Sequence, residues 1–541
     1  MARLESLSDD VILYMIECFE YERDLNSFSQ TNKRLYSLTN PYLYKRDFQK
    51  RDFTALTWAL EFDLVGTARK VLAAGAHELL QAHAPHWPML PIVQAAMCGS
   101  VEVMKVFLET DGVDPNLVDW EGCSAIAAAA RKGHAEIIKL LLADPRVDPG
   151  IRNEDGKTPL VISISDSESE SCEEIVKLLL QDSRVDPTVA TRWGVTPLIC
   201  ATTCTEKNEA LARLLLADPR VDPNVGDSEG CTPLMWAVRC PGDNVGVIKL
   251  LLADPRVKLD DLDQRGRSAM HWAACAGYAR NIQVLLDAGG SVTVGEASTG
   301  LTPLALAVQS EKVDAVKLLL NVPEADPNAL DLSGRTPLMH SADWELPEMT
   351  RILIADERIL PNIVDNSGVT ALGYACASGD LDCVEALLTH KDLDPNTNSR
   401  NKIPALCFAA AEGQYKIAKR LVEDPRLDAD KAVDDQKWTP VHYAAANGYE
   451  DTIKLLYDSG RFRIDSLDVD GRNALSFAAE MGAEGVVKLL VKMYKEIGAI
   501  PWNVPDNDGQ TPESYAEYGG FDDVAAIIAS GECPSDEEME S

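Results

Sequence analysis

Long hydrophobic runs are missing from this sequence. No stretch approaches the roughly 18 consecutive apolar residues of a transmembrane helix, so we expect no membrane-spanning segment. The opening residues are acidic and lack an apolar core, so we expect no secretory signal. Signature motifs of serine hydrolases, zinc peptidases and kinases are also absent from the sequence. We therefore predict a protein that is not an enzyme and that uses no cofactor.

Basic residues are scarce relative to acidic ones. The chain has 51 Lys and Arg against 86 Asp and Glu, which gives a formal net charge of −35. Such a charge repels phosphate backbones and anionic lipid surfaces. The composition therefore argues against nucleic acid and membrane as partners, and it favours a protein partner with a basic surface.

Cysteine usage shows no disulfide framework. The 13 cysteines are odd in number and scattered, and several, such as Cys200, Cys376 and Cys407, fall in predicted helices. This pattern is typical of reduced thiols that pack as small apolar side chains. It predicts a location in the cytoplasm, the nucleus or both. Histidines are also few, and His77, His83 and His86 form the only close group. No cysteine or acid at ligand spacing completes a zinc site there, so we predict no metal.

One short phrase recurs along most of the chain. Gly-x-Thr-Pro-Leu stands at 156–160, 194–198, 230–234, 300–304 and 334–338, and weaker copies fill the intervals. Successive Thr positions lie 34 to 38 residues apart. A fixed period of this size predicts a solenoid of stacked units that share one continuous core.

The copy at 122–149 shows what one unit contains. Ser124 can cap a short alanine-rich helix that ends at Gly133. A second helix follows, with Ile and Leu side chains over 137–142 forming a wide apolar face, and Asp144-Pro145 ends it. Neither helix can bury its apolar face alone. Each unit therefore needs a neighbouring copy.

These units resemble the ankyrin repeat, which consists of a turn and two helices and carries the motif Thr-Pro-Leu-His-x-Ala. His271 and His442 occupy the His position of that motif. The resemblance implies an all-α solenoid of about fourteen copies over residues 52–530. It also implies a partner-binding face made of turn tips and the ends of the first helices. The residues that fall there are Trp120, Arg131, Lys132, Arg192, Trp193, Arg239, Gln309, Glu412, Trp438, Asn447 and Glu480.

A second phrase, Ala-Asp-Pro-Arg-Val-Asp-Pro or a close variant, follows several of the second helices. Stacking would place its arginines in a column beside neighbouring aspartates. We interpret this column as a solvated loop with local ion pairs, which contribute little to stability when they are exposed. The arginines concerned are Arg146, Arg184, Arg220, Arg256 and Arg426.

Residues 1–46 differ in character from the repeats. The segment predicts three short amphipathic helices, the first of them capped by Ser8. It resembles an F-box, the module with which a family of proteins binds the SKP adaptor of a cullin-RING ubiquitin ligase. The resemblance implies a substrate receptor that is a monomer within a larger complex. The alternative is a helical cap for the solenoid. The implied adaptor-binding residues are Leu7, Val11, Ile12, Met15 and Phe28.

Two acidic segments interrupt or end the repeats. The run Ser163 to Glu174 is rich in Ser, Asp and Glu, and we expect it to disturb the first helix of its copy and to form a loop. It is compatible either with a tolerated insertion or with phosphorylation by an acid-directed kinase. Residues 531–541 predict an acidic disordered tail.

Overall fold

A pair of antiparallel helices followed by a projecting turn is the repeating unit of the computed structural model. The structure describes residues 54–73, 90–167, 170–203, 208–241, 244–397, 403–431, 433–498 and 503–531. The predicted adaptor-binding residues, the three histidines at 77, 83 and 86, and the acidic tail lie outside these ranges. The chain divides into two compact units, Met1–Gln264 and Arg265–Ser541, and each is described by itself.

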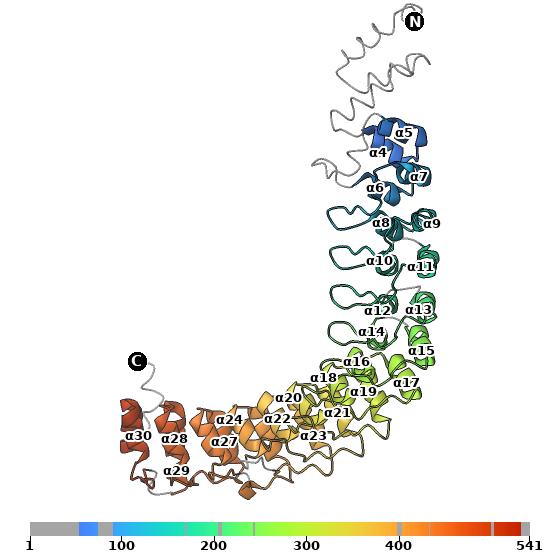
Figure 1. Ribbon diagram of the computed structural model, residues 1–541. Coiled ribbons are helices and arrows are strands. Elements are labelled where there is room, and N and C mark those ends of the chain that lie inside the picture. The colour runs from blue at the N-terminus through green and yellow to red at the C-terminus, as the bar shows by residue number, and fades with distance from the viewer. Residues whose placement is uncertain are drawn as a thin grey trace, which may run out of the picture. The chain divides into compact units, whose positions relative to one another are not determined.

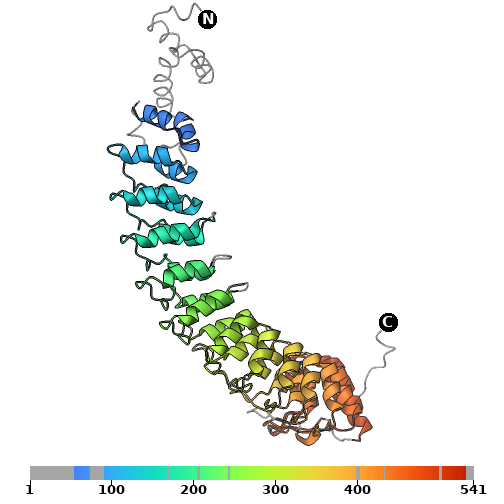
Figure 2. The same ribbon diagram turned by 90° about the vertical axis from the view of Figure 1, so that its right-hand side faces the viewer.

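In the first unit, the first and second helices of successive repeats form two separate rows, and the turns project beside the first row (Figures 1 and 2). The first helices are α4 (Thr54–Glu61), α6 (Pro91–Cys98), α8 (Ala125–Lys132), α10 (Pro159–Ser165), α12 (Pro197–Thr203) and α14 (Pro233–Arg239). The second helices are α5 (Val65–Ala73), α7 (Val101–Glu109), α9 (Ala135–Ala143), α11 (Cys172–Gln181), α13 (Asn208–Leu216) and α15 (Val245–Ala253).

The second unit repeats the same pairing. Its first helices are α16 (Ala269–Ala276), α18 (Pro303–Gln309), α20 (Pro337–Asp343), α22 (Ala371–Ser378), α24 (Ala405–Ala411), α26 (Pro440–Ala446), α28 (Ala474–Glu480) and α30 (Pro512–Gly519). Its second helices are α17 (Ala279–Asp287), α19 (Val313–Leu320), α21 (Pro347–Ile354), α23 (Leu381–Leu388), α25 (Tyr415–Val422), α27 (Glu450–Asp458), α29 (Glu484–Glu496) and α31 (Asp522–Ser530). A short 3-10 helix, η2 (Ala429–Lys431), follows α25. Within the described ranges no strand is formed, and the all-α solenoid predicted from the sequence is confirmed.

The helix boundaries follow from the residues that begin and end each helix. The Ser124 hydroxyl accepts a hydrogen bond from the Ala127 amide, and Thr158 caps α10 in the same way, with a proline at the first helical position. Gly133 ends α8 with a φ of 83°, which glycine adopts at little cost. The predicted cap and stop of this copy are therefore confirmed.

The core lies between the two helix rows and between successive repeats. In α9 the side chains of Ile137, Ile138 and Leu141 are fully buried, while the small side chains of Ala128 and Ala129 in α8 are buried where neighbouring first helices meet. Alanine allows these short helices to approach closely, so each repeat buries its apolar face only by stacking on its neighbours.

The acidic run of residues 163–174 leaves the first helix of its copy intact, which corrects the expectation that the run disturbs this helix. Its first three residues end α10 and its last three begin α11, and the described residues between them are not helical. Ser163 lies inside α10 with its side chain fully buried, because its hydroxyl donates to the Leu160 carbonyl at 2.7 Å. Cys172 begins α11, and its side chain is buried in the core. The acidic residues therefore extend from a connection between two intact helices.

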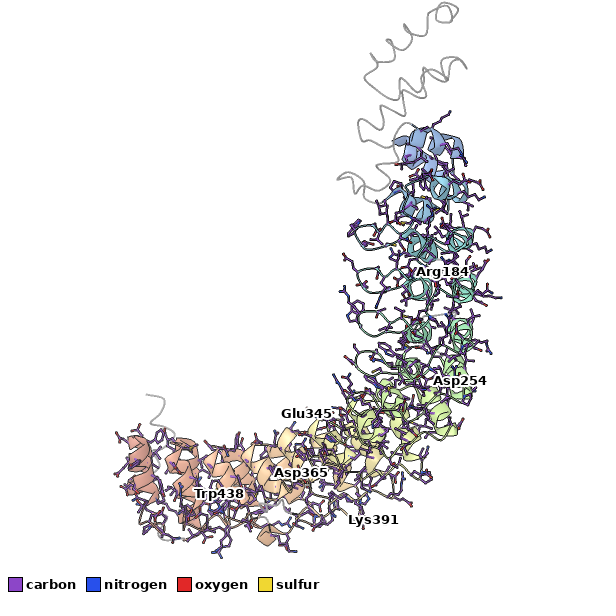
Figure 3. The ribbon with its side chains drawn as sticks, in the orientation of Figure 1. Arg184, Asp254, Glu345, Asp365, Lys391 and Trp438 are labelled. Atoms are coloured by element: carbon purple, nitrogen blue, oxygen red, sulfur yellow. The ribbon has the colours of Figure 1, made fainter. Side chains whose placement is uncertain are left out.

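The arginines of the second phrase form a structural element that we call the arginine clamp. The Arg184 guanidinium binds both carboxylate oxygens of Asp182, at 3.0 and 2.7 Å. It also donates to the carbonyls of Leu142 at 2.7 Å and Val147 at 2.9 Å, which belong to the preceding repeat (Figure 3). Six arginines act in this way: Arg146, Arg184, Arg220, Arg256, Arg358 and Arg426.

The arginine clamp corrects the interpretation of this phrase as a merely solvated loop. The local ion pair is present, but the guanidinium also occupies the C-terminal end of the previous second helix. The last carbonyls of a helix have no partner within the helix and carry partial negative charge, so a cation is stabilising there. The hydrogen bond from Arg184 holds the pKa of the Asp182 carboxyl below its ordinary value.

A row of asparagines joins the same loops through the backbone. Asn328 donates from its side-chain nitrogen to the Arg358 carbonyl at 2.8 Å, and its side-chain oxygen accepts from the Leu360 amide at 2.8 Å. This two-way bond fixes the loop of one repeat against the loop of the next. The members are Asn116, Asn224, Asn328, Asn362 and Asn396.

We expect His442 to make the second unit sensitive to mild acid. Its side chain is buried, its Nδ1 accepts from the Thr439 amide at 3.0 Å, and burial lowers its pKa to about 4. Because an unfolded histidine has a pKa of about 6.5, the unfolded state takes up the proton first. Stability is therefore complete above about pH 6.5 and is lost as the pH falls toward 4, by about 2 kcal/mol at pH 5 from this group. Urea unfolding at pH 7 and pH 5 measures the loss.

The matched variant for this prediction is His442→Gln, which keeps a hydrogen-bond acceptor near Nδ1 but does not titrate. The variant should lose less stability between pH 7 and pH 5 than the wild type. An identical loss in both proteins would assign the acid sensitivity to other groups.

Candidate interaction surface

The turns that project beside the first helices are held by a repeated set of hydrogen bonds. In the turn at Asp119, one carboxylate oxygen accepts from the amides of Glu121 at 3.0 Å and Cys123 at 2.8 Å. Gly122 completes the turn with a φ of 74°. The aspartate and the glycine therefore fix the shape of the turn, and the two residues between them are free to vary.

Neighbouring turns are connected into a ladder by their backbones. The Arg192 amide donates to the Asp155 carbonyl at 3.0 Å, and the Ser228 amide donates to the Trp193 carbonyl at 3.0 Å. The second unit has the same bonds, for example from Leu332 to Thr299 at 2.8 Å. Within each unit the tips form a continuous edge whose spacing is set by the backbone.

Two of the predicted tip residues present large aromatic surfaces. Trp120 is 68% exposed and Trp193 is 51% exposed. The Arg192 guanidinium lies over the Trp193 ring, 5.6 Å from its centroid, and also donates to the Glu154 carbonyl. Tryptophan and arginine are enriched among the residues that contribute most to protein–protein binding.

Trp438 differs from the other two tip tryptophans because it packs on its own unit. Its ring centroid lies 4.3 Å from that of Phe477 and 5.2 Å from that of Tyr443, and the side chain is half-buried (Figure 3). Trp438 therefore presents less surface to a partner than Trp120 or Trp193.

The remaining predicted residues lie at or near the ends of first helices. In the first unit, Arg131 lies 3.9 Å from Glu121, and the Arg239 guanidinium covers the Trp236 ring at 4.5 Å. Lys132 is half-buried at the end of α8. In the second unit the exposed members are Gln309, Glu412, Asn447 and Glu480, the last of which pairs with Arg472.

Sequence reasoning missed a link between several turns and the first helices that follow them. In these repeats the residue four positions after the cap binds the second oxygen of the turn aspartate, as Tyr374 does with Asp365 at 2.5 Å and Tyr443 with Asp434 at 2.7 Å. Trp236 donates to Asp227 at 2.9 Å in the first unit. The signal was an aspartate followed nine residues later by an aromatic side chain that can donate.

Arginines cover this aromatic row in the second unit. The Arg335 guanidinium lies 4.5 Å from the centroid of Tyr374, and that of Arg472 lies 4.0 Å from Phe477 and 4.2 Å from Tyr515. These cation–π contacts hold the rings and the cations in one layer. The first helices of the second unit therefore carry a layer of paired arginine and aromatic side chains next to the turns.

A comparison with known protein families agrees with this architecture. A family model described as ankyrin repeats (3 copies) matches residues 92–190, 167–263, 243–331, 320–401 and 391–468, which together cover more than half of the chain. The chain belongs to the ankyrin repeat family. Ankyrin repeats serve protein–protein interaction, so the array has a protein-binding role. No curated protein sequence matches the chain.

Metal-binding and membrane-spanning features are also absent from the described residues. In the part of this ankyrin protein that the structure describes, no group of three or more His, Cys, Asp and Glu side chains could hold a metal ion. No described helix is long and apolar enough to cross a membrane.

Proposed function

We propose that this ankyrin protein is the substrate-recognition subunit of an SCF-type cullin-RING ubiquitin ligase. In this role it performs no chemistry itself, binds the SKP adaptor through residues 1–46 and binds the substrate through the array. The observation that carries the proposal is the F-box-like sequence around Leu7, Val11, Ile12, Met15 and Phe28, placed directly before a protein-binding array. An adaptor-binding module followed by a binding surface is the organisation that a substrate receptor requires.

The charge and surface of the array support a protein substrate with basic character. A net charge of −35 attracts basic proteins over distances of about a Debye length and speeds their encounter. Trp120, Trp193 and Arg192 then supply the short-range contacts in the first unit. We place the complex in the cytoplasm, the nucleus or both, with one copy of the chain in each assembly.

A scaffold or inhibitor is the second candidate, and an observation at the start of the array favours it. Phe62 is 63% exposed and Leu64 is 41% exposed in the connection between α4 and α5, the first described helix pair. Terminal repeats of a solenoid usually need a polar or covered outer face. If residues 1–46 cover these side chains, their apolar face is buried within the chain and cannot bind an adaptor.

A pull-down of the full-length chain with the purified SKP adaptor tests the proposal. The double variant Leu7→Asp/Ile12→Asp should lose adaptor binding by at least about tenfold, because two charges would have to enter an apolar interface. The matched control Leu330→Asp/Leu332→Asp adds the same charge at exposed positions of the array and should bind like the wild type.

Either result separates the two candidates. Binding by the wild type that only the first variant loses supports the receptor. No binding by a wild-type chain with a native circular dichroism spectrum contradicts the receptor and leaves the scaffold.

A further inference from the structure

The cleft between α21 and α23 is one of the clefts between second helices that lack the arginine of the clamp. Arg358 donates to the carbonyls of Leu320 at 2.5 Å and Ala325 at 3.1 Å, at the C-terminal end of α19. One period of 34 residues later stands Asp392, and one further period later Arg426 resumes the arginine clamp on α23. The C-terminal end of α21 therefore receives no guanidinium from the repeat that follows it.

The backbone at Asp392 is held as it is in the repeats that carry the arginine. Asn362 donates to the Asp392 carbonyl at 2.7 Å and accepts from the Asp394 amide at 2.9 Å. Asn328 makes the same pair of bonds around Arg358, and Asn396 makes them around Arg426. The two kinds of repeat therefore share the path of the loop but differ in two side chains. Asp392 replaces the arginine, and His390 replaces the aspartate that the arginine binds.

The cleft itself is wide and has acidic walls. It has a volume of about 850 Å³ between α21 and α23, whereas the cleft that contains Arg220, between α11 and α13, has about 400 Å³. The carboxylates of Glu357, Glu385 and Asp392 line it, and Lys391 is labelled at its edge (Figure 3). The other cation on its wall, Arg351, lies 3.8 Å from Asp382 on α23.

The end of α21 also differs from the end of α17, which is another helix end without an arginine from the repeat that follows. At α17, where Glu324 stands at the arginine position, Gly289 and Gly290 donate their amides to Leu286 and Leu285 at 2.9 Å. Helix α21 ends at Ile354 without such glycines. Among the described residues, no hydrogen-bond donor reaches the Ile354 carbonyl oxygen.

We propose that the cleft between α21 and α23 binds the guanidinium of an arginine side chain from the protein partner. The inference rests on the proposed partner-binding role of the array and specifies the chemistry that one cleft recognises. A helix C-terminus and three carboxylates attract a cation. Six equivalent clefts of the same chain show that a guanidinium, with several donors in one plane, satisfies this arrangement of carbonyl oxygens.

An arginine of the protein partner would make, between two molecules, the guanidinium–carbonyl contact that the arginine clamp makes within this chain. Lysine is a poorer occupant because its ammonium is a compact charge that cannot bind two carbonyls and a carboxylate in one plane. The acidic wall also excludes a partner that presents a carboxylate at this point. The surface lies on the second helices and is therefore separate from the turn tips.

Saturation-transfer NMR with N-acetyl-arginine amide as the probe tests the proposal on the full-length chain. The wild type should transfer saturation to the arginine side-chain protons and much less to those of N-acetyl-citrulline amide, the neutral analogue. The variant Asp392→Arg supplies the guanidinium from the chain itself and should reduce the signal at least about fivefold. The control Asp451→Arg makes the same change of charge at an exposed position of α27 and should keep the signal.

Two additional readouts make the result decisive. Asp392→Arg should raise the thermal unfolding midpoint relative to Asp451→Arg, since it supplies the cross-repeat donors of the arginine clamp. Glu357→Gln/Glu385→Gln should weaken the signal while keeping the fold, which covers the case in which Asp392→Arg misfolds. Equal signals from both probes, or equal signals from both arginine variants, would overturn the proposal. Because no adaptor is present, failure here is distinguishable from failure of the receptor assignment.

Discussion

Replacing Gly194 with alanine should destabilise the first unit by about 3 kcal/mol. Gly194 has a φ of 75°, and a Cβ atom there would lie 2.5 Å from the Ser228 amide nitrogen and 2.9 Å from the Asp227 carbonyl carbon. Both atoms belong to the backbone of the next turn, which cannot rotate away. The added methyl group therefore breaks the bond from Ser228 to Trp193 and separates the two tips.

Gly112→Ala is the matched control for this substitution. Gly112 has a φ of 84°, but no atom lies within 4 Å of its Cβ position. It should therefore show only the cost of the left-handed backbone, about 1 kcal/mol. Urea unfolding gives both values, and hydrogen exchange at the Ser228 amide reports the local effect. Equal costs at the two positions would contradict the role of the turn ladder in stability.

Replacing Arg358 with glutamine should destabilise the second unit by about 2–3 kcal/mol. The substitution removes the bidentate contact to Asp356 and the bonds to Leu320 and Ala325 together. The Asp356 side chain, only 14% exposed, would keep its charge without its partner. Thermal or urea unfolding of the full-length chain measures the loss.

Arg463→Gln separates the contribution of the local ion pair from that of the hydrogen bonds to the previous repeat. Arg463 also binds both oxygens of its aspartate, Asp465, at 3.1 and 3.0 Å, but it is 80% exposed and makes no bond to another repeat in the described structure. Its loss should cost less than about 0.5 kcal/mol. A similar cost at both positions would mean that the cross-repeat bonds of Arg358 add nothing.

The cost of Arg358→Gln should also depend on pH. The hydrogen bond from Arg358 lowers the pKa of the Asp356 carboxyl in the folded state. A carboxyl with a lowered folded pKa contributes stability above the ordinary value of about 3.9 and loses it as the pH falls through the lower, folded pKa. The wild type and the variant should therefore become more alike below about pH 4.

The repeat period and the turn chemistry made much of the fold predictable. A Thr-Pro start, a glycine end and an apolar second helix are local signals, so the boundaries around Ser124 and Gly133 could be predicted without a structure. The effect of the acidic run on α10 was misjudged because composition does not show that Ser163 satisfies its hydroxyl within its own helix.

Interactions between repeats were less accessible from the sequence. The pairing of Arg184 with Asp182 is visible because the two lie two residues apart, but the Leu142 carbonyl, 42 residues away, becomes a partner only after stacking. Arg358 was overlooked because Glu357 replaces the first proline of its phrase and Leu360 replaces the second aspartate. The exposure of Trp193 followed from its place at a turn tip, whereas the burial of Trp438 depends on Phe477 from the next repeat.

The backbone ladder of the turns has a consequence for how binding specificity can change. Because a polar side chain, a glycine and one amide–carbonyl bond fix the backbone of each tip, that backbone accepts different pairs of residues, as Trp120-Glu121, Glu154-Asp155 and Arg192-Trp193 show. A new pair of side chains at one tip leaves the spacing of the others unchanged. Recognition can therefore be altered one repeat at a time, with each tip acting as an independently replaceable contact.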